Sequence, residues 1–308
     1  MLALMRSPSY SPLPSPIPAV ASRTVRRPLI PFVCLAAFCV VAWHSYPTIS
    51  DITVPQNVDT TTAFSTNECL IIVVTPTYAR PTRMPDLTRL AQTLMLVKNI
   101  HWLVIEDANR TSDAVNRLLQ RSGVPHTYLF TTSVDSLPKR GWSHRNMAID
   151  IIKTKYRDYN GCAVVYFADD DNTYDFRLFD EYIRKVKGVG LWAVGFSGGA
   201  KVEAPHVENG KITKWDVVYA PKRQFATDMA GFAVNLRVLI NSTARFTKKC
   251  GKSDPENCFL KQLNVSMKDL EPFGYDRQPK EILVWHTQSK LPKGSGPSYG
   301  YVYEEKKT

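Results

Sequence analysis

The chain has 308 residues, of which 44% are hydrophobic and 22% charged, which is enough for one large or two small globular domains. It has no Gly-rich Walker loop and no zinc-finger spacing of Cys and His, so neither of those sites is expected. Lysines and arginines (39) outnumber aspartates and glutamates (28), and the net charge of +11 indicates an anionic partner. Binding to nucleic acid would rest on charge alone and is not expected.

The N-terminal region has the charge pattern of a membrane anchor. Three arginines within residues 23–27 precede the uncharged apolar run 28–43. This run is shorter than the ~20 residues that cross an average bilayer, but thinner membranes accept shorter spans. A cleaved signal peptide is the alternative, although no small-x-small cleavage site follows Trp43. The basic flank predicts a type II protein with a cytoplasmic tail (1–27), an anchor (28–45) and a luminal remainder.

The segment after the anchor is polar. Residues 46–67 are rich in Thr, Ser and Asn and predict a stem. A lumen permits disulfides, and Cys250 and Cys258 are near enough in sequence to close a small loop, although spacing alone does not fix the pairing. Three glycosylation sequons, usable only on the luminal side, begin at Asn109, Asn241 and Asn264.

From residue 70 onward, apolar runs alternate with amphipathic segments. A buried strand is predicted at 70–74, where Pro76 stops it, and an amphipathic helix follows with Leu87, Leu90, Leu94 and Val97 at helical spacing. The next expected elements are a strand at 101–108, a helix at 112–120, a strand at 126–131, a loop and helix at 139–153, and a strand at 162–171. This alternation predicts a parallel α/β sheet with helices on both faces.

Polar side chains follow several of these predicted strands. Tyr78, Asp107 and the run Asp169, Asp170 and Asp171 each come just after a strand end. Because ligands bind parallel sheets beyond the carboxyl ends of the strands, we expect these groups to meet at one ligand edge.

The three consecutive aspartates suit a divalent cation that holds a diphosphate, because hard oxygens are the ligands of Mg²⁺ and Mn²⁺. A solvated acidic turn and the N-cap of a helix from Asp175 are alternatives. A calcium loop fails, because Tyr174 stands where its glycine is required.

Other segments are ambiguous when taken one at a time. Arg140 and Arg145 lie near a predicted helix start, where cations suit a phosphate, but a solvated basic loop explains them equally. Asp228 lies in apolar sequence that reads as core. His286 ends a predicted strand in ILVWHT (282–287), where a lone histidine is more often structural than catalytic.

In combination and in order, these segments carry a specific resemblance. They are IIVVTPTYARPTR, HWLVIEDA, RGWSHRN, VVYFADDDNTYD, WAVGFSGG, DMAGFAV, KDLEP and VWHT, spread over roughly residues 70–288. The set resembles the β-1,3-glucuronosyltransferases of the Golgi. That resemblance implies a UDP-sugar-binding domain of glycosyltransferase A type (68–199), followed by an acceptor-binding region with the C-terminal tail (200–308).

The resemblance also implies a role for each motif residue. On the donor side, Tyr78, Asp107, Arg140 and Arg145 match positions that bind uridine and diphosphate, Asp169 and Asp170 match residues near the ribose and donor sugar, and His286 matches a diphosphate contact. Asp171 matches the Mn²⁺ ligand. On the acceptor side, Glu203, Arg223 and Asp228 match galactose-binding residues, and Glu256 matches the general base.

The implied enzyme is a Golgi-membrane homodimer that transfers glucuronic acid from UDP-glucuronic acid to O3 of a terminal β-galactose. Two acceptors stay open, the galactosyl-galactosyl-xylose linkage of proteoglycans, which we favour, and N-acetyllactosamine ends. A catalytically silent glycan-binding homologue is a further alternative. Gln288 stands where the family often has Arg, and the tail after Pro292 departs from the common pattern, which leaves dimer contacts and acceptor choice open.

Overall fold

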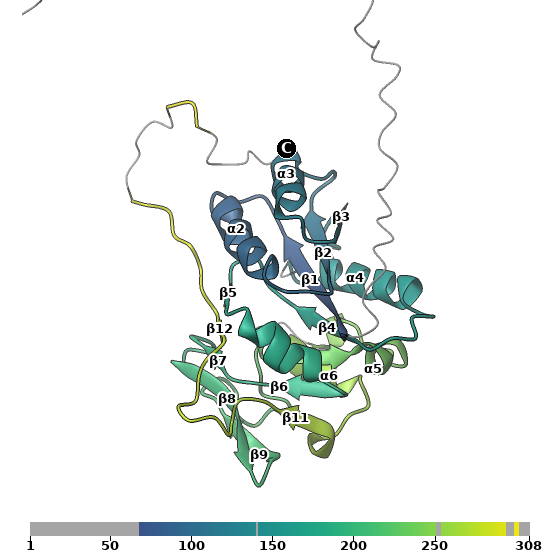
Figure 1. The fold of residues 1–308 in the computed structure, drawn as a ribbon, viewed down its shortest axis with the longest axis vertical. Coiled ribbons are helices and arrows are strands. Elements are labelled where there is room, and N and C mark those ends of the chain that lie inside the picture. Colours follow the sequence, from purple (N-terminus) through teal and green to yellow (C-terminus); the bar gives the residue numbers. More distant parts are fainter. Residues whose placement is uncertain (1–67, 140, 251–253, 294–298, 302–308) are drawn as a thin grey trace, which may run out of the picture. The chain divides into compact units, whose positions relative to one another are not determined.

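The computed structural model describes residues 68–139, 141–250, 254–293 and 299–301 (Figure 1). The predicted tail, anchor and stem lie outside these residues. In the part of the chain that is described, no helix combines the length and the apolar character needed for a membrane span.

The first half of the fold alternates strand and helix, as predicted. The elements are β1 (Leu70–Thr77), α2 (Arg83–Leu94), β2 (Ile100–Asp107), α3 (Asp113–Ser122), β3 (His126–Thr131), α4 (Trp142–Lys155) and β4 (Ala163–Phe167). Strands β4, β1, β2 and β3 are parallel neighbours in that order. The predicted parallel sheet is therefore confirmed for these four strands.

The second half is built from shorter elements. They are β5 (Thr173–Tyr174), β6 (Val189–Leu191), β7 (Val194–Gly195), β8 (Val202–Glu208), β9 (Lys211–Asp216), β10 (Phe232–Asn235), α5 (Leu236–Ile240), α6 (Pro255–Lys261), β11 (Leu270–Pro272) and β12 (Val284–Trp285). Short π- and 3₁₀-turns lie between them at Leu178–Tyr182, Ile183–Lys185, Met229–Gly231, Lys248–Cys250 and Met267–Asp269.

Within the described residues these strands form two sheets. The larger has the order β11-β6-β10-β4-β1-β2-β3, and β10 lies antiparallel between β4 and β6. The smaller has the order β5-β12-β7-β8-β9. Because β10 comes from beyond residue 199 yet pairs with β4, late sequence completes the sheet that early sequence begins. The division into regions 68–199 and 200–308 stays a prediction.

Strand β1 runs through Pro76 to Thr77, so the prediction that Pro76 stops it is wrong. Pro76 pairs in register with Ile105 of β2. On the other side of β1, the ladder with β4 ends at Val74, whose carbonyl accepts a hydrogen bond from Ala168. In a strand, residues two apart direct their backbone groups to the same side, so Pro76 faces the same side as Val74, towards β4. Because β4 has already ended there, the N–H that proline lacks would have had no partner, and the strand can continue.

The core lies on both faces of the larger sheet. Leu70, Ile72 and Val74 of β1 join one apolar cluster, and Ile71 and Val73 join the other. A strand with both faces covered by apolar groups reads as a continuous hydrophobic run, which is what the sequence shows.

Helix α3 has clear end signals. The Ser112 side chain accepts a hydrogen bond from Val115 N at its start, and Gly123 ends the helix at φ 65°. Both are the residue types that such positions favour.

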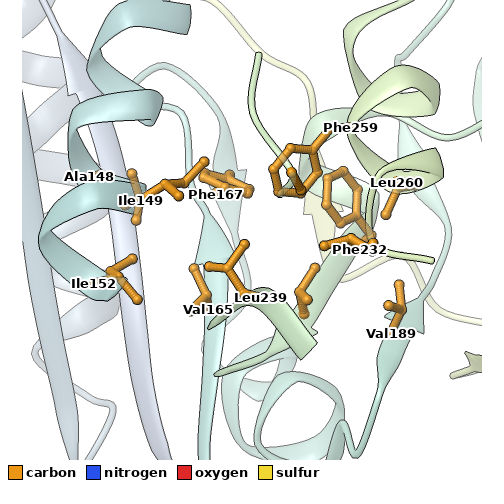
Figure 2. Packing of buried hydrophobic residues seen from close by; sticks show 14 of the residues in the cluster. Ala148, Ile149, Ile152, Val165, Phe167, Val189, Phe232, Leu239, Phe259 and Leu260 are labelled. Carbon is orange, nitrogen blue, oxygen red and sulfur yellow. The ribbon is translucent and has the colours of Figure 1, made fainter. Parts of the chain in front are cut away.

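Aromatic packing fixes the segment that follows β4. Phe167 meets Phe259 of α6 edge to face, with ring centroids 5.5 Å apart, and Phe246 stacks on Phe259 at 4.9 Å. Figure 2 shows α4, β4, β10 and α6 contributing side chains to this one cluster. Helix α6 is thereby held beside the end of β4.

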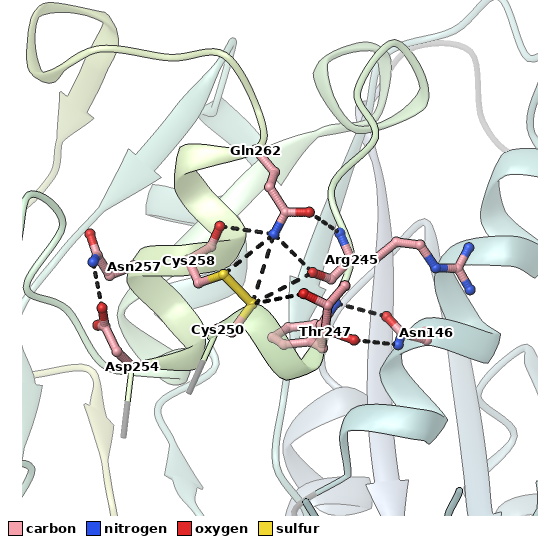
Figure 3. Close-up of a disulfide and its surroundings, with 9 residues drawn as sticks. Asn146, Arg245, Thr247, Cys250, Asp254, Asn257, Cys258 and Gln262 are labelled. Carbon is pink, nitrogen blue, oxygen red and sulfur yellow. Dashed lines mark hydrogen bonds between the residues drawn. A yellow bond between two sulfur atoms is a disulfide. The ribbon is translucent and has the colours of Figure 1, made fainter. Parts of the chain in front are cut away.

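Two disulfides close the fold. Cys69 pairs with Cys162, joining the residues just before β1 and β4, and Cys250 pairs with Cys258 of α6. Around the second disulfide, Gln262 donates to the Cys258 and Arg245 carbonyls at 2.9 Å each (Figure 3). The loop that the sequence suggested for Cys250 and Cys258 is present.

Candidate functional site

The turn of three aspartates follows β4 directly, and each carboxylate has its own environment. Asp169 forms an ion pair with Arg145, which α4 presents from its first turn. The Arg145 guanidinium also lies over the Phe246 ring, 5.9 Å from its centroid. Arg145 is nearly fully buried, so the protein holds this cation firmly against the turn.

Asp170 ties the turn to the end of β1. Its carboxylate accepts hydrogen bonds from Thr77 Oγ1 and Arg80 Nη1, both at 2.7 Å, and Arg80 also binds Asp86 at 3.0 Å. Burial raises the pKa of Asp170, and Arg80 and Thr77 oppose that rise. These partners make Asp170 a structural support for its neighbours.

Asp171 is held by its backbone and leaves its carboxylate available. Its carbonyl accepts hydrogen bonds from Arg89 Nη2 of α2 at 2.7 Å and from Thr287 Oγ1 at 2.8 Å. Among the described residues, its carboxylate has no hydrogen-bond partner. Burial, and then the charges of Asp169 and Asp170, raise its pKa to about 6.

This environment fits a hard divalent cation. No group of three or more His, Cys, Asp or Glu side chains in the described part of the chain is arranged to hold a metal. A cation here would take one or two carboxylate oxygens and complete its shell with water and phosphate oxygens, as Mg²⁺ and Mn²⁺ commonly do. The carboxylate of Asp171, which has no hydrogen-bond partner among the described residues, could supply such an oxygen ligand to the cation.

Asp107 ends β2 and lies on the same sheet edge. It accepts hydrogen bonds from Ser133 N (3.0 Å) and Ser133 Oγ (2.7 Å), and its Oδ1 lies 3.7 Å from His144 Nε2. Burial lowers the pKa of His144, although the Asp107 charge opposes the change. His144 and Arg145 are consecutive, so the first turn of α4 reaches both Asp107 and Asp169.

Tyr78 lies just beyond β1 and is 53% exposed. The Arg80 guanidinium sits over its ring at 5.0 Å from the centroid. An exposed aromatic ring at this edge is free to stack on a flat ligand group. Arg140, the other predicted donor-side cation, lies outside the described residues.

His286 and Asp228 form a pair beside the aspartate turn. His286 Nδ1 lies 3.4 Å from Asp228 Oδ2. The hydrogen bond and charge of Asp228, with smaller effects of Asp169 and Asp171, raise the pKa of His286 to about 9. Burial alone would raise the pKa of Asp228, but His286 and the hydrogen bonds from Ala230 and Ser197 outweigh burial and lower it. His286 is therefore a cation at neutral pH.

Glu203 lies on β8 and is 4% exposed. Its Oε2 is 3.1 Å from Ser197 Oγ, and the same hydroxyl is 2.8 Å from Asp228 Oδ2. Glu203 Oε1 is buried and lacks a hydrogen-bond partner among the described residues. Ser197 thus joins two of the residues expected on the acceptor side.

Glu256 lies in the first turn of α6, between Pro255 and the core-forming Phe259. Burial, and then the negative charge of Asp228, raise the pKa of its carboxyl to about 8, while Arg145 and Arg223 oppose the rise. A carboxyl with a pKa near neutrality is suited to accept and release a proton. The sequence could place this residue only by resemblance.

Arg223 borders a hollow of about 470 Å³ that Lys222, Asp254, Asn257 and Lys261 also line. Its Nη1 lies 3.7 Å from Asp254 Oδ1, and its Nη2 donates to the Tyr219 carbonyl at 3.0 Å. The hollow opens beside the helix that carries Glu256.

Segments far apart in sequence therefore meet at one place. Asp228, Asp169 and Asp171 raise the pKa of His286. Asp228 raises the pKa of Glu256, and Arg145 and Arg223 oppose that rise. Ser197 extends the group to Glu203. Arg80 contacts both Tyr78 and Asp170, and His144 of α4 contacts Asp107, so Tyr78 and Asp107 lie at the same sheet edge.

Three residues that support this site were not predicted. Arg80 is part of the TPTYARPTR segment, but nothing in that segment marks its partner Asp170. Arg89 reads as an ordinary polar position of an amphipathic helix, and Ser197 as part of a Gly-rich turn. Their roles come from contacts between distant segments, which a single sequence does not reveal.

Comparison with known proteins gives consistent results. The model of glycosyltransferase family 43 matches residues 90–290. The human galactosylgalactosylxylosylprotein 3-beta-glucuronosyltransferase 1 is 42% identical over 236 residues, which cover 72% of this chain and 70% of that protein. The chain belongs to glycosyltransferase family 43.

A second relative is the Caenorhabditis elegans galactosylgalactosylxylosylprotein 3-beta-glucuronosyltransferase sqv-8. It is 39% identical over 241 residues, covering 74% of this chain and 66% of that protein. The solved structure of S. aureus TarS 1-349 covers 71% of this chain and 60% of its own at 13% identity, and its TM-score of 0.44 is too low to support a conclusion. The resemblance read from the sequence motifs is confirmed at the level of the family.

Proposed function

We propose that this family 43 member transfers glucuronic acid from UDP-glucuronic acid to O3 of a terminal β-galactose. The observation that carries the proposal is Glu256, a carboxyl with a pKa of about 8 beside Asp228 and two arginines. Asp228, whose charge acts on Glu256, also pairs with His286, and His286 in turn lies near Asp171. One acid–base group and one diphosphate-binding group are what a single displacement requires.

The reaction follows from these positions. Glu256 accepts the proton of the galactose 3-hydroxyl as that oxygen bonds to the anomeric carbon of the glucuronate. The bond from the anomeric carbon to the diphosphate breaks, and its electron pair leaves with UDP. Attack occurs on the face opposite UDP, so the anomeric configuration inverts.

Cations stabilise the departing diphosphate. Arg145 and the imidazolium of His286 lie beside the aspartate turn and offset the charge that grows on the leaving oxygen. Asp171 would hold Mn²⁺, which when bound supplies further positive charge at the diphosphate. Tyr78 and Asp107 are the residues we assign to the uridine, with Arg140 as a further donor-side cation.

Glu203, Arg223 and Asp228 are the residues we assign to the galactose. Glu203 and Asp228 share the hydroxyl of Ser197, so a sugar hydroxyl that donates to either carboxylate would meet an acceptor that is already held in place. The names of the curated relatives support the galactosyl-galactosyl-xylose acceptor for this chain. Transfer to N-acetyllactosamine ends and a catalytically silent glycan-binding protein are the alternatives.

A type II protein of the Golgi membrane, acting as a homodimer, completes the proposal. Two disulfides fit an oxidising lumen. The side chains of the three sequon asparagines, Asn109, Asn241 and Asn264, are all exposed, as glycosylation requires.

A direct assay tests the function. The full chain, with Mn²⁺, is incubated with UDP-glucuronic acid and either a galactosyl-galactosyl-xyloside or N-acetyllactosamine, and the product linkage is read by NMR. We expect a β1→3 glucuronide on the first acceptor, and UDP-glucose in place of the donor serves as control. UDP binding without any product from either acceptor would support the silent homologue instead.

A further inference from the structure

Ser197 stands between two carboxylates. The side chain is 2% exposed, and its Oγ lies 2.8 Å from Asp228 Oδ2 and 3.1 Å from Glu203 Oε2. A serine hydroxyl carries one proton, so it can donate to only one of the two oxygens at a time.

The backbone around Ser197 is shaped to make both contacts possible. Phe196 has φ 60°, an unfavourable value for a bulky residue, and Gly198 has φ 57°. A Cβ at Gly198 would lie 1.9 Å from Glu203 Oε1, so only glycine lets this carboxylate approach. The turn is closed by hydrogen bonds from Phe196 N to Lys201 O (2.9 Å) and from Ala200 N to Ser197 O (2.8 Å).

The two carboxylates differ in what else they contact. Asp228 also accepts a hydrogen bond from Ala230 N at 2.9 Å and pairs with His286, which lies beside the aspartate turn. Glu203 has a buried oxygen with no hydrogen-bond partner among the described residues. Among the described residues Ser197 is the one hydrogen-bond donor to the Glu203 carboxylate, through Oε2, so as long as no ligand is bound Glu203 depends on the Ser197 proton.

A ligand would change this distribution. A sugar hydroxyl that donates to Glu203 Oε2, the oxygen that Ser197 contacts, would replace Ser197 there, and the Ser197 proton is then available to Asp228. A stronger hydrogen bond to Asp228 holds it in place against His286, which faces the donor diphosphate in the proposed function.

We propose that Ser197 is a positioning residue that couples galactose binding at Glu203 to Asp228, which is also assigned to the galactose and which pairs with His286 on the donor side. The proposal rests on the acceptor and donor roles given above. It requires each ligand to raise the affinity of the other by the same factor, because binding linkage is reciprocal.

The test measures this factor. Titration calorimetry of the full chain with UDP and Mn²⁺ is performed with and without a saturating galactose-terminated disaccharide. For the wild type we expect the disaccharide to raise UDP affinity by about fivefold or more, within the usual range of such couplings. The reverse titration, disaccharide with and without UDP, should give the same factor.

Two variants remove the donor. Ser197→Ala lacks the hydroxyl, and Ser197→Cys keeps nearly the same volume with a weak donor. Both should reduce the coupling factor to less than about twofold, while UDP affinity without disaccharide changes little because His286 and Ala230 still hold Asp228.

Ser242→Ala provides the matched control. Ser242 is also buried, and its hydroxyl donates to the Leu239 carbonyl at 2.8 Å, near the opposite end of α4 from Arg145. This variant should melt lower yet keep the wild-type factor, which separates loss of stability from loss of coupling.

The outcomes are distinct. A wild-type factor retained in Ser197→Cys or Ser197→Ala overturns the inference, and so does a wild type that binds both ligands with a factor of one. A wild type that binds neither UDP nor the disaccharide defeats the proposed function itself.

Discussion

At the scale of single residues, the ionised carboxylate of Asp171 lowers the stability of the metal-free protein. Arg145 and Arg80 take the carboxylates of Asp169 and Asp170, while that of Asp171 stays partly buried and unpartnered within the described residues. Folding raises its pKa from 3.8 to about 6, so the folded state binds the proton more tightly than the unfolded chain. The ionised form therefore destabilises the metal-free protein above pH ~6, and this cost disappears as the pH falls below 4.

Asp171→Asn removes both the cation ligand and the charge. We expect Mn²⁺ affinity to fall by at least about tenfold, since even outer-shell changes have effects of that size. Without metal, the variant should equal or exceed the wild type in stability at pH 7.5 by up to about 2 kcal/mol, and the difference should shrink toward pH 4. Calorimetric Mn²⁺ titration and melting curves at several pH values check this. A variant that binds Mn²⁺ as the wild type does would remove Asp171 from the site.

As the proposed general base, Glu256 should set the pH dependence of transfer. A base with a pKa of about 8 is mostly protonated at pH 7, so the unprotonated fraction falls tenfold for each pH unit below 8. We expect kcat/KM to rise about tenfold per unit from pH 6 to 7 and to level off above 8. A profile that is flat between pH 6 and 8, in a range where the wild type remains folded, contradicts this assignment.

At the scale of elements, two helices bring the chemistry to the turn after β4. The first turn of α4 directs His144 toward Asp107 and Arg145 toward Asp169, two sites at the ends of different strands. Helix α6 packs Phe259 against Phe167, which lies just before the aspartate turn, and so carries Glu256 to the same place (Figure 2). Apolar packing thus determines where Glu256, the proposed base, lies.

The two disulfides should stabilise the fold unequally. Cys69–Cys162 closes a sequence separation of 93 residues and Cys250–Cys258 one of 8. Loop-closure entropy assigns them about 4.5 and about 2.5 kcal/mol of stabilisation. Replacing each pair by alanines and measuring unfolding in denaturant should show a loss about 2 kcal/mol larger for the first pair. Equal losses, or the opposite order, would show that native contacts rather than the unfolded chain decide the effect.

The sequence predicted the elements whose pattern is local. The apolar run of β1, the capped helix α3 and the aspartates after β4 lie where their residue types place them. The position of β10 between β4 and β6 could not be predicted from the sequence. The four residues of β10 resemble any short apolar run, and the strands with which they pair are remote in sequence. The strand expected to end at His286 is only two residues long, Val284–Trp285, and it lies between β5 and β7 of the smaller sheet.

The same limit applies to the site. Asp171 and Glu256 carry signals in residue type or motif, whereas Arg89 and Ser197 act through partners that the sequence does not indicate. The prediction that Pro76 ends the first strand was wrong for a similar reason. Its effect on β1 depends on where the neighbouring strand ends, and that is a property of the sheet rather than of the proline.

At the scale of the whole molecule, the site lies where the two sheets share a turn. The three aspartates connect β4 of the larger sheet to β5 of the smaller one. His286 follows β12, Ser197 follows β7, and Glu203 lies on β8, all in the smaller sheet. The smaller sheet therefore supplies His286 to the donor side and Glu203 to the acceptor side, while the strands of the larger sheet lead to Tyr78, Asp107 and the aspartate turn.

Removal of residues 1–65 should leave an active protein. The described core begins with Cys69, which forms a disulfide, and Leu70, which is fully buried. We expect a soluble product whose melting temperature and transfer rate match those of the full chain in detergent. Removal of residues 1–70 serves as the control and should lower the melting temperature clearly, because it deletes the disulfide and the start of β1. An insoluble or inactive shorter deletion would place the boundary elsewhere.

The most direct test of the account is the turnover of Glu256→Gln. Glutamine keeps the size and hydrogen bonding of the side chain at the start of α6 but cannot accept the proton. If Glu256 only favours the helix N-terminus, the change alters stability by at most ~1 kcal/mol and leaves the rate alone. If Glu256 is the general base, transfer from UDP-glucuronic acid should fall by at least about a hundredfold, with UDP affinity and melting temperature near those of the wild type. A fall of less than about tenfold would contradict the account and direct attention to Asp228, then to Glu203, as the base.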